Sequence, residues 1–372
     1  MHRSFLLIAG LLFSFGLSTP ASAQEPDPYA DGKALVADLD KIVTPRGVDD
    51  TFVATLGGTR QVVNVRGADR DNPILLFIHG GPAAPEMPIA WAFQRPWEDF
   101  FTVVQWDQRG SGRSFELNDP EKIAPTLKVD RYRDDAIELI EQLQKRYGKR
   151  KVFVLGHSWG SIVGLSVAIK RPDLLYAYIG IGQVIDFRRN EQLGFERTLE
   201  AARESKNAVA VRELEAIRPY PGAGPFDIDK VAVDRKWSDY FGGLAAGRTN
   251  GDFYFHLGRL SPLYTPADRK AWDAGSAFTI KTLLPQLSSV NFSNVHKLDV
   301  PVLMLLGKHD TTTPSGIAAE WMNRLQAPDK RVVWFKNSAH LPFIEEPGRT
   351  LEALVRFALP LAGEADSAPK QD

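Results

Sequence analysis

The chain of 372 residues contains no cysteine, so it can form neither a disulfide nor a thiolate metal site. Its 45 Lys and Arg residues nearly balance 46 Asp and Glu residues, with both signs interspersed. This balance argues against a nucleic-acid partner, which would require a basic surface. The sequence also lacks an internal repeat, a glycine-rich phosphate loop and a histidine cluster spaced for a metal. We therefore expect no metal and no cofactor.

Long apolar runs are scarce as well, and residues 5–17 form a run of only about a dozen residues, whereas a membrane-spanning helix needs roughly 20. Arg3 precedes this run, and the small residues Ala21-Ser22-Ala23 follow it. The pattern predicts a secretory signal peptide over residues 1–23, with an uncleaved anchor as the alternative. Because no cysteine follows the signal, a lipid-anchored form is excluded. We expect an exported protein, periplasmic or secreted, without stable membrane insertion after signal cleavage.

The rest of the chain alternates apolar runs with segments of helical spacing, which predicts an α/β fold with a mostly parallel eight-stranded sheet and helices on both faces. The expected strands are 51–56, 59–65, 73–78, 101–106, 151–155, 175–181, 300–306 and 331–335. Gly57-Gly58 separates the first two and predicts a hairpin. The expected divisions are an N-terminal arm 24–50, a core in two parts at 51–185 and 297–361, an inserted helical cap 186–296, and a disordered polar tail 362–372.

A G-x-S-x-G pattern, Gly156-His157-Ser158-Trp159-Gly160, lies between the expected strand 151–155 and a helical segment at 161–170. Short Gly/Ser patterns recur by chance, so an ordinary turn with an incidental serine is the alternative. In a sharp strand-to-helix turn, however, glycines on both sides permit the close approach that raises the serine hydroxyl at a helix N-terminus. The context predicts that Ser158 is a nucleophile.

Two further polar residues follow the ends of expected strands: Asp310 after 300–306, and His340 after 331–335. The order Ser, Asp, His is that of α/β-hydrolases. A serine hydroxyl needs an imidazole to take its proton and a carboxylate to orient that imidazole. We assign Ser158 as nucleophile, His340 as general base and then acid, and Asp310 as the orienting acid. Asp299 is a rival for the acid, but it precedes its strand and so lies at the wrong end of the sheet. His309 is a rival for the base, but it is adjacent to Asp310 in a turn, where neighbouring side chains rarely face each other. For His340, the alternative is an ordinary histidine in a surface loop.

An acyl-transfer site also needs donors for the oxyanion of the tetrahedral intermediate. We expect the backbone N–H of Trp159, the residue after the predicted nucleophile, to be one donor. Gly81, in the loop after the strand that ends at Ile78, is the expected second donor. A simple turn at Gly80-Gly81 is the alternative.

Three motifs together resemble the proline iminopeptidase (prolyl aminopeptidase) family of α/β-hydrolases. They are His-Gly-Gly-Pro at 79–82, Asp-Gln-Arg-Gly-Ser-Gly-Arg-Ser at 107–114 and Ser-Trp-Gly-Ser at 158–161. With the acid and histidine loops, the resemblance spans residues 50–360. It implies removal of an N-terminal residue, often proline, from short peptides, without a metal and beneath a helical cap. It also implies that Asp107, Arg109 and Gly112 are structural.

The cap departs from this family, whose Trp-Ser-x-Trp-Glu motif binds the substrate's α-ammonium through its glutamate. Residues 237–241 read Trp-Ser-Asp-Tyr-Phe here, so Phe241 takes the place of the glutamate. Asp252 lies near the position of a second cap carboxylate of the family. Substitute anchors for an ammonium are Glu191, Glu196 and Asp239, each with a solvated surface charge as the alternative. Ala83-Ala84-Pro85 also replaces a further glycine of the family's first motif.

The leading hypothesis is an exported serine hydrolase that acts through an acyl-enzyme as an iminopeptidase-like aminopeptidase on small peptides or amides. The first alternative is a carboxylesterase-type hydrolase of a small uncharged ester, suggested by Phe241. The second is a non-catalytic binding protein on the same fold. The expected partner is a small-molecule or short-peptide substrate.

Overall fold

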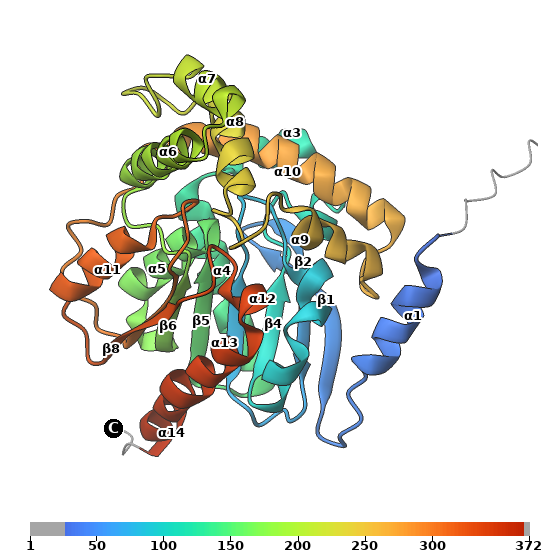
Figure 1. Cartoon of the computed structure of the whole chain (residues 1–372). Helices are drawn as coiled ribbons and strands as arrows, with labels where there is room; N and C mark the ends of the chain where they lie inside the picture. The colour runs from blue at the N-terminus through green and yellow to red at the C-terminus, as the bar shows by residue number, and fades with distance from the viewer. Residues whose placement is uncertain (1–26, 368–372) are drawn as a thin grey trace, which may run out of the picture.

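One eight-stranded sheet lies at the centre of the computed structural model, which describes residues 27–367 (Figure 1). The strand order is β1-β2-β4-β3-β5-β6-β7-β8, with β2 antiparallel to β1 and β4 and all other neighbours parallel. The strands are β1 Val48–Leu56, β2 Thr59–Gly67, β3 Ile74–Ile78, β4 Thr102–Trp106, β5 Val152–His157, β6 Leu175–Ile181, β7 Val302–Gly307 and β8 Lys330–Phe335. The predicted mostly parallel eight-stranded sheet is confirmed. The predicted signal peptide, 1–23, lies outside the described residues.

The central strands β3 to β7 are buried along their whole length, as expected for strands covered on both faces. At the edge of the sheet, β1 and β2 form the predicted hairpin. Gly57 and Gly58 have φ of 51° and 73°, a region that a side chain disfavours. The Gly-Gly pair therefore determines where the first hairpin turns.

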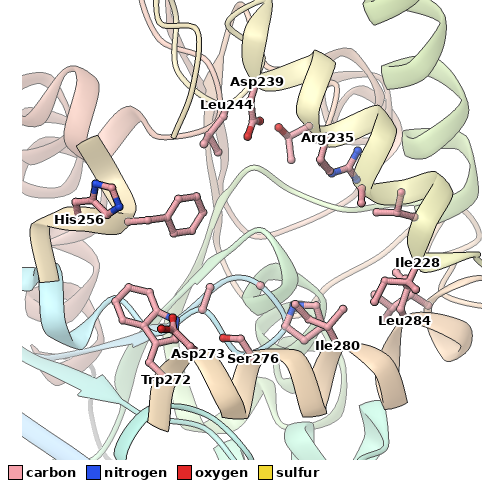
Figure 2. A pocket seen from close by; sticks show the side chains of 18 of the residues that line it. Ile228, Arg235, Asp239, Leu244, His256, Trp272, Asp273, Ser276, Ile280 and Leu284 are labelled. Carbon is pink, nitrogen blue, oxygen red and sulfur yellow. The ribbon is translucent and has the colours of Figure 1, made fainter. Parts of the chain in front are cut away.

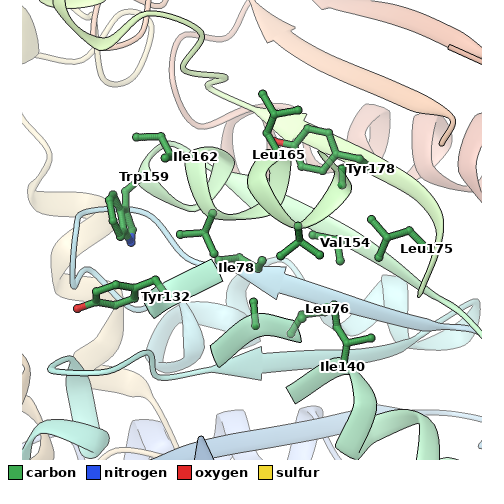
Figure 3. Packing of buried hydrophobic residues seen from close by; sticks show 14 of the residues in the cluster. Leu76, Ile78, Tyr132, Ile140, Val154, Trp159, Ile162, Leu165, Leu175 and Tyr178 are labelled. Carbon is green, nitrogen blue, oxygen red and sulfur yellow. The ribbon is translucent and has the colours of Figure 1, made fainter. Parts of the chain in front are cut away.

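Helices cover both faces of the sheet. On one face, α4 (Val129–Tyr147), α5 (Trp159–Lys170) and α11 (Ser315–Arg324) contribute to a large buried cluster, part of which Figure 3 shows. On the other face, η2 (Arg95–Asp99), α12 (Pro342–Glu345) and α13 (Pro347–Ala353) contribute to a second cluster. The shorter helices of the core are η1 Met87–Ala92, α2 Gly112–Glu116, α3 Pro120–Ile123, η3 Ala124–Thr126 and η4 Pro172–Leu174. The sheet is thus a rigid layer that can hold loops at fixed positions along its edge.

The segment between β6 and β7 forms the helical layer at the top of Figure 1. Its helices are α6 Phe187–Glu204, α7 Ala208–Ala216, α8 Ile228–Tyr240, α9 Asp252–Leu257, η5 Gly258–Leu260 and α10 Pro266–Leu287. Phe195, Leu199, Leu214 and Trp237 belong to a buried cluster of this layer's own. The expected cap interval 186–296 contains all of these helices.

The two ends of the described chain are helical. In the expected arm, α1 spans Ala30–Leu39, beside η5. At the other end, α13 continues through a π-helical turn, Leu354–Ala358, into α14, Pro360–Ser367. The expected disordered tail, 362–372, thus overlaps this helix, and its first residue, Ala362, is buried against the core. Residues 368–372 lie outside the described part. Between residues 27 and 367, no helix combines the length and apolar character that crossing a membrane requires.

Candidate active site

Ser158 occupies the turn between β5 and α5, with φ 54° and ψ −118°, a conformation that is strained for a residue with a side chain. A side chain at Gly156 would collide with the carbonyl of Gly160, and one at Gly160 would collide with the carbonyl of Ile78. The Ser158 N–H donates to the carbonyl of Ile181 at 2.9 Å, which holds the turn. The two glycines thus allow the tight turn, and the serine side chain stays partly exposed at the start of α5.

His340 and Asp310 form a hydrogen-bonded pair in the loops after β8 and β7. His340 Nδ1 lies 2.9 Å from Asp310 Oδ2, and both side chains are buried. Asp310 also accepts from the N–H of Thr313 at 2.7 Å and from its hydroxyl at 2.9 Å. A carboxylate at Nδ1 favours the tautomer with its proton there, which leaves Nε2 free to accept from a hydroxyl.

The three predicted residues share one edge of the sheet, because they follow β5, β7 and β8, which run parallel through β6. The loops also touch. The ring of His157, next to Ser158, lies 4.9 Å from the His340 ring between centroids, and its Nε2 lies 3.2 Å from the His340 carbonyl. Gly182 was not singled out from the sequence, although it directly follows β6. Its φ is +55°, and a Cβ there would lie 2.6 Å from His340 Cε1.

The loop after β3 lies against Ser158, since a Cβ at Gly80 would be 3.2 Å from the Cβ of Ser158. Gly81 follows, with φ +111°. Trp159 is the first residue of α5, so its N–H belongs to the first turn, which has no acceptor within the helix. Gln108 links the two segments: it accepts from Trp159 Nε1 at 2.9 Å and donates to the His79 carbonyl at 3.0 Å. Both predicted oxyanion donors thus lie in segments adjacent to Ser158.

The motif at 107–114 makes buried contacts within the core. Arg109 Nε donates to Asp135 at 2.8 Å, and both side chains are fully buried. Arg109 Nη2 also donates to the carbonyl of Leu56 at 2.9 Å. Asp107 accepts from the hydroxyl of Tyr264 and the N–H of Arg113, and burial raises the pKa of Asp107 to about 7. These contacts are structural, as the resemblance implies.

A cavity of about 790 Å³ lies between the cap helices α8 and α10 (Figure 2). Its floor includes Gly81, Pro82, Ala84 and Thr312, which belong to the loop after β3 and to the loop that carries Asp310. Most of its wall is apolar. The charged side chains on it are Arg235, Asp239, Arg259, Arg269 and Asp273. The cavity therefore borders the loop of Gly81 and the loop of Asp310, whereas Ser158 and His340 are not among its lining residues.

The family described as alpha/beta hydrolase fold matches residues 73–347. The chain belongs to this alpha/beta hydrolase family. A probable aminopeptidase, YbaC of Bacillus subtilis (strain 168), is 32% identical over 314 residues, covering 82% of this chain and 94% of that protein. A proline iminopeptidase of Saccharolobus solfataricus is 24% identical over 315 residues, covering 80% of this chain and 87% of that protein.

Two solved structures show the same fold. The proline iminopeptidase of Mycobacterium smegmatis has a TM-score of 0.59 at 18% identity, covering 85% of this chain and 100% of that one. An esterase of Exiguobacterium antarcticum has a TM-score of 0.55 at 19% identity, covering 83% and 98%. The predicted fold class and the resemblance to proline iminopeptidases are confirmed, and the chain is a hydrolase of this family with peptidase relatives.

Of the candidate substrate contacts in this α/β-hydrolase, Asp239 lines the cavity from α8 (Figure 2). Burial raises the pKa of its carboxyl to about 6, and the positive charge of Arg235 opposes the rise. Within residues 27–367, the carboxylate of Asp239 forms no hydrogen bond or ion pair. Asp239 is thus a partly buried negative charge that faces the cavity with unused acceptor capacity.

Glu191 and Phe241 lie outside the cavity lining. Glu191 is buried and bound to the hydroxyl of Tyr220 and the guanidinium of Arg235. Phe241 packs on Trp237, four positions earlier on the same face of the helix. Because residues two positions apart lie on different faces of a helix, Phe241 does not share the cavity-facing side with Asp239. Arg235 does line the cavity, but its positive charge is already paired with two carboxylates, that of Glu191 and, at 2.7 Å, that of Asp234.

The other cap carboxylates considered from the sequence also lie elsewhere. Glu196 accepts from Gln192 at 3.0 Å, and Asp252 is exposed at the start of α9. In the described part of the chain, no three His, Cys, Asp or Glu side chains are grouped so as to hold a metal ion.

Proposed function

We propose that this α/β-hydrolase is a serine hydrolase in which Ser158 is the nucleophile, His340 the general base and Asp310 the orienting acid. The single observation that carries the proposal is the strained serine at the start of α5 on the same sheet edge as the His340–Asp310 pair. His340 Nε2 takes the proton as Ser158 Oγ attacks the substrate carbonyl. Asp310 holds the tautomer and stabilises the imidazolium that forms.

The oxyanion of the tetrahedral intermediate accepts from the backbone N–H groups of Gly81 and Trp159. His340 then gives its proton to the leaving group, and the acyl group stays on Ser158 Oγ. A water molecule, deprotonated by His340, attacks this ester, and the serine leaves with the proton.

The proposed substrate is a small peptide or amide with a free N-terminal amine, cleaved by aminopeptidase or iminopeptidase action. The names of the relatives support this class. So does Asp239, whose unpaired carboxylate faces the cavity and can bind an ammonium group. A volume of about 790 Å³ suits a short peptide and leaves no room for a folded protein chain.

An uncharged ester is the second candidate. It is favoured by the apolar part of the same wall, which includes Leu244, Trp272, Ile280 and Leu284. Phe241, which suggested an ester from the sequence, gives no support, since it does not line the cavity. The two candidates differ in one respect, namely whether an amine on the substrate increases kcat/KM.

The test compares the parent enzyme with Ser158→Ala and with Ser166→Ala, a partly buried serine on the same helix whose hydroxyl bonds only within α5. Substrates are aminoacyl naphthylamides, short peptides and p-nitrophenyl esters. We expect Ser158→Ala to lose at least about 10³-fold in kcat and Ser166→Ala to keep it. Full activity in Ser158→Ala would refute the nucleophile, and turnover of esters alone would refute the peptidase.

We also propose export, because residues 1–23 have the composition of a signal peptide. N-terminal sequencing of protein from a cell-envelope fraction is expected to begin near Gln24. Recovery of the uncleaved chain in the cytosol only would refute export.

A further inference from the structure

Glu86 is a fully buried carboxylate in the loop between β3 and η1, and the reaction described above does not use it. Its oxygens accept from three segments that are far apart in the chain. His157 Nδ1 lies at 2.7 Å, the hydroxyl of Tyr254 at 2.8 Å and the N–H of Gly80 at 3.2 Å. A buried carboxylate is costly unless it is hydrogen-bonded, and these contacts offset that cost.

The hydrogen-bond pattern also sets the charge of the cluster. His157 Nε2 faces the carbonyl of His340, which can only accept, so Nε2 carries a proton. A further proton must then lie between His157 Nδ1 and Glu86, on the ring or on the carboxyl. In both cases the pair is neutral overall, so Glu86 adds no net negative charge next to the developing oxyanion.

Glu86 holds the loop that presents Gly81. It fixes the N–H of Gly80, while the carbonyl of Gly80 accepts from the N–H of Ala84 at 3.2 Å. Because a peptide unit is planar, fixing the carbonyl of Gly80 also fixes the direction of the Gly81 N–H on the same peptide bond. Through His157, Glu86 supports the backbone of His340 as well.

Tyr254 connects this cluster to the cap. It lies on α9, and the next two residues, Phe255 and His256, line the cavity. A molecule that presses on α9 from inside the cavity is therefore two hydrogen bonds away from the oxyanion loop, through Tyr254 and Glu86.

We propose that Glu86 is a positioning residue that orients the Gly81 N–H and the His340 loop and links both to cap helix α9. The proposal rests on the proposed serine-hydrolase function. Glu86 is buried and does not line the cavity, so its loss should alter the alignment of other groups at the transition state more than ground-state binding.

The first test is Glu86→Gln, which keeps the size of the side chain but replaces one acceptor oxygen by an amide nitrogen, so that the N–H of Gly80 or the hydroxyl of Tyr254 loses its acceptor. We expect kcat to fall about 10- to 100-fold, with KM changed less than threefold. Glu98→Gln is the matched control. Glu98 is also buried, and it binds Arg66 at 2.9 Å and Gln94 at 2.8 Å in a part of the core away from the site. We expect this control to keep kcat.

A second readout is the rate at which a fluorophosphonate labels Ser158, because its phosphoryl oxygen needs the same N–H donors. We expect Glu86→Gln to be labelled completely but about 10- to 100-fold more slowly. Unchanged kcat and labelling rate would overturn the positioning role while leaving Ser158 as nucleophile. Absence of label on Ser158 in the parent would instead overturn the proposed function, and an equal loss in Glu98→Gln would reduce the effect to general destabilisation.

Tyr254→Phe tests the link to the cap and remains decisive if Glu86→Gln does not fold. It removes one hydroxyl and leaves Glu86 two donors. We expect kcat to fall about threefold to tenfold for aminoacyl naphthylamides, which are large enough to reach α9, and to stay unchanged for the smaller p-nitrophenyl acetate. If Tyr254→Phe changes kcat by the same factor for both substrates, the link to the cap is overturned.

Discussion

Replacing Asp239 by Asn is the most direct test of substrate class, because the change removes the negative charge and keeps the shape of the side chain. Asp239 faces the cavity from α8 and has no partner of its own in residues 27–367 (Figure 2). If the substrate's ammonium binds there, the variant loses a charge-assisted hydrogen bond. An uncharged ester makes no such bond and should be indifferent to the change.

A hydrogen bond to a charged group contributes about 1.5–3 kcal/mol, which corresponds to a factor of about 10 to 150. We expect Asp239→Asn to lower kcat/KM for aminoacyl naphthylamides by this factor. N-acetylated analogues, which carry no charge, should react equally well with both enzymes. Asp229→Asn removes an exposed carboxylate from the same helix, outside the cavity lining, and should change neither rate.

The pH dependence of the reaction tests the negative charge of Asp239 independently. Because burial raises the pKa of Asp239 to about 6, about nine-tenths of the group is charged at pH 7 and about a tenth at pH 5. Attraction for an ammonium is therefore present above about pH 6 and is lost as the pH falls through that value.

The assay is the ratio of kcat/KM for the free-amine substrate to that for its acetylated analogue, which cancels any effect of pH that is common to both substrates. This ratio should fall about fivefold to ninefold from pH 7 to pH 5 in the parent and stay flat in Asp239→Asn. A flat ratio in the parent, or an equal ratio in both enzymes at pH 7, would refute the role of Asp239 as amine anchor.

Two further predictions concern the framework of the site. Gly182→Ala places a Cβ 2.6 Å from His340 Cε1 and should lower kcat at least about 10²-fold. The control Gly58→Ala is also at positive φ but has open space around it, and it should keep kcat. Full activity in Gly182→Ala would contradict the packing of Gly182 against His340. Arg109→Leu removes the fully buried one of the two cations that bind Asp135, the other being Arg131 at 2.9 Å, and should lower the free energy of unfolding in urea by about 3 kcal/mol; an unchanged midpoint would contradict the buried pair.

The sheet and the predicted catalytic residues could be located from the sequence because their signals are local. The central strands β3 to β7 are short, mostly apolar runs, and Ser158, Asp310 and His340 come within five residues of a strand end. In a parallel sheet this position alone brings residues to one edge. The three-dimensional arrangement then follows without knowledge of long-range packing.

The substrate contacts could not be located in the same way. Helix α8 carries charges on all its sides, so its periodicity does not identify the face toward the cavity. Asp239 and Phe241, both from one short motif, point to different surroundings for this reason. Glu191 is occupied by Tyr220 and Arg235, which come from other parts of the cap.

Glu86 was missed for a similar cause. A single acidic residue in a loop gives no sign of the partners that surround it, since His157 and Tyr254 are distant in the chain.

The insertion of the cap between β6 and β7 has a consequence for the folding of the chain. Ser158 is carried by strands that precede the cap, whereas Asp310 and His340 are carried by strands that follow it. Pairing β7 with β6 closes a loop of about 120 residues, which costs about 2 kcal/mol more in chain entropy than closing a loop of ten. A cap that packs its own cluster before this closure shortens the effective loop. Mutations in that cluster should therefore slow the assembly of the active site, even though none of its buried residues lines the cavity.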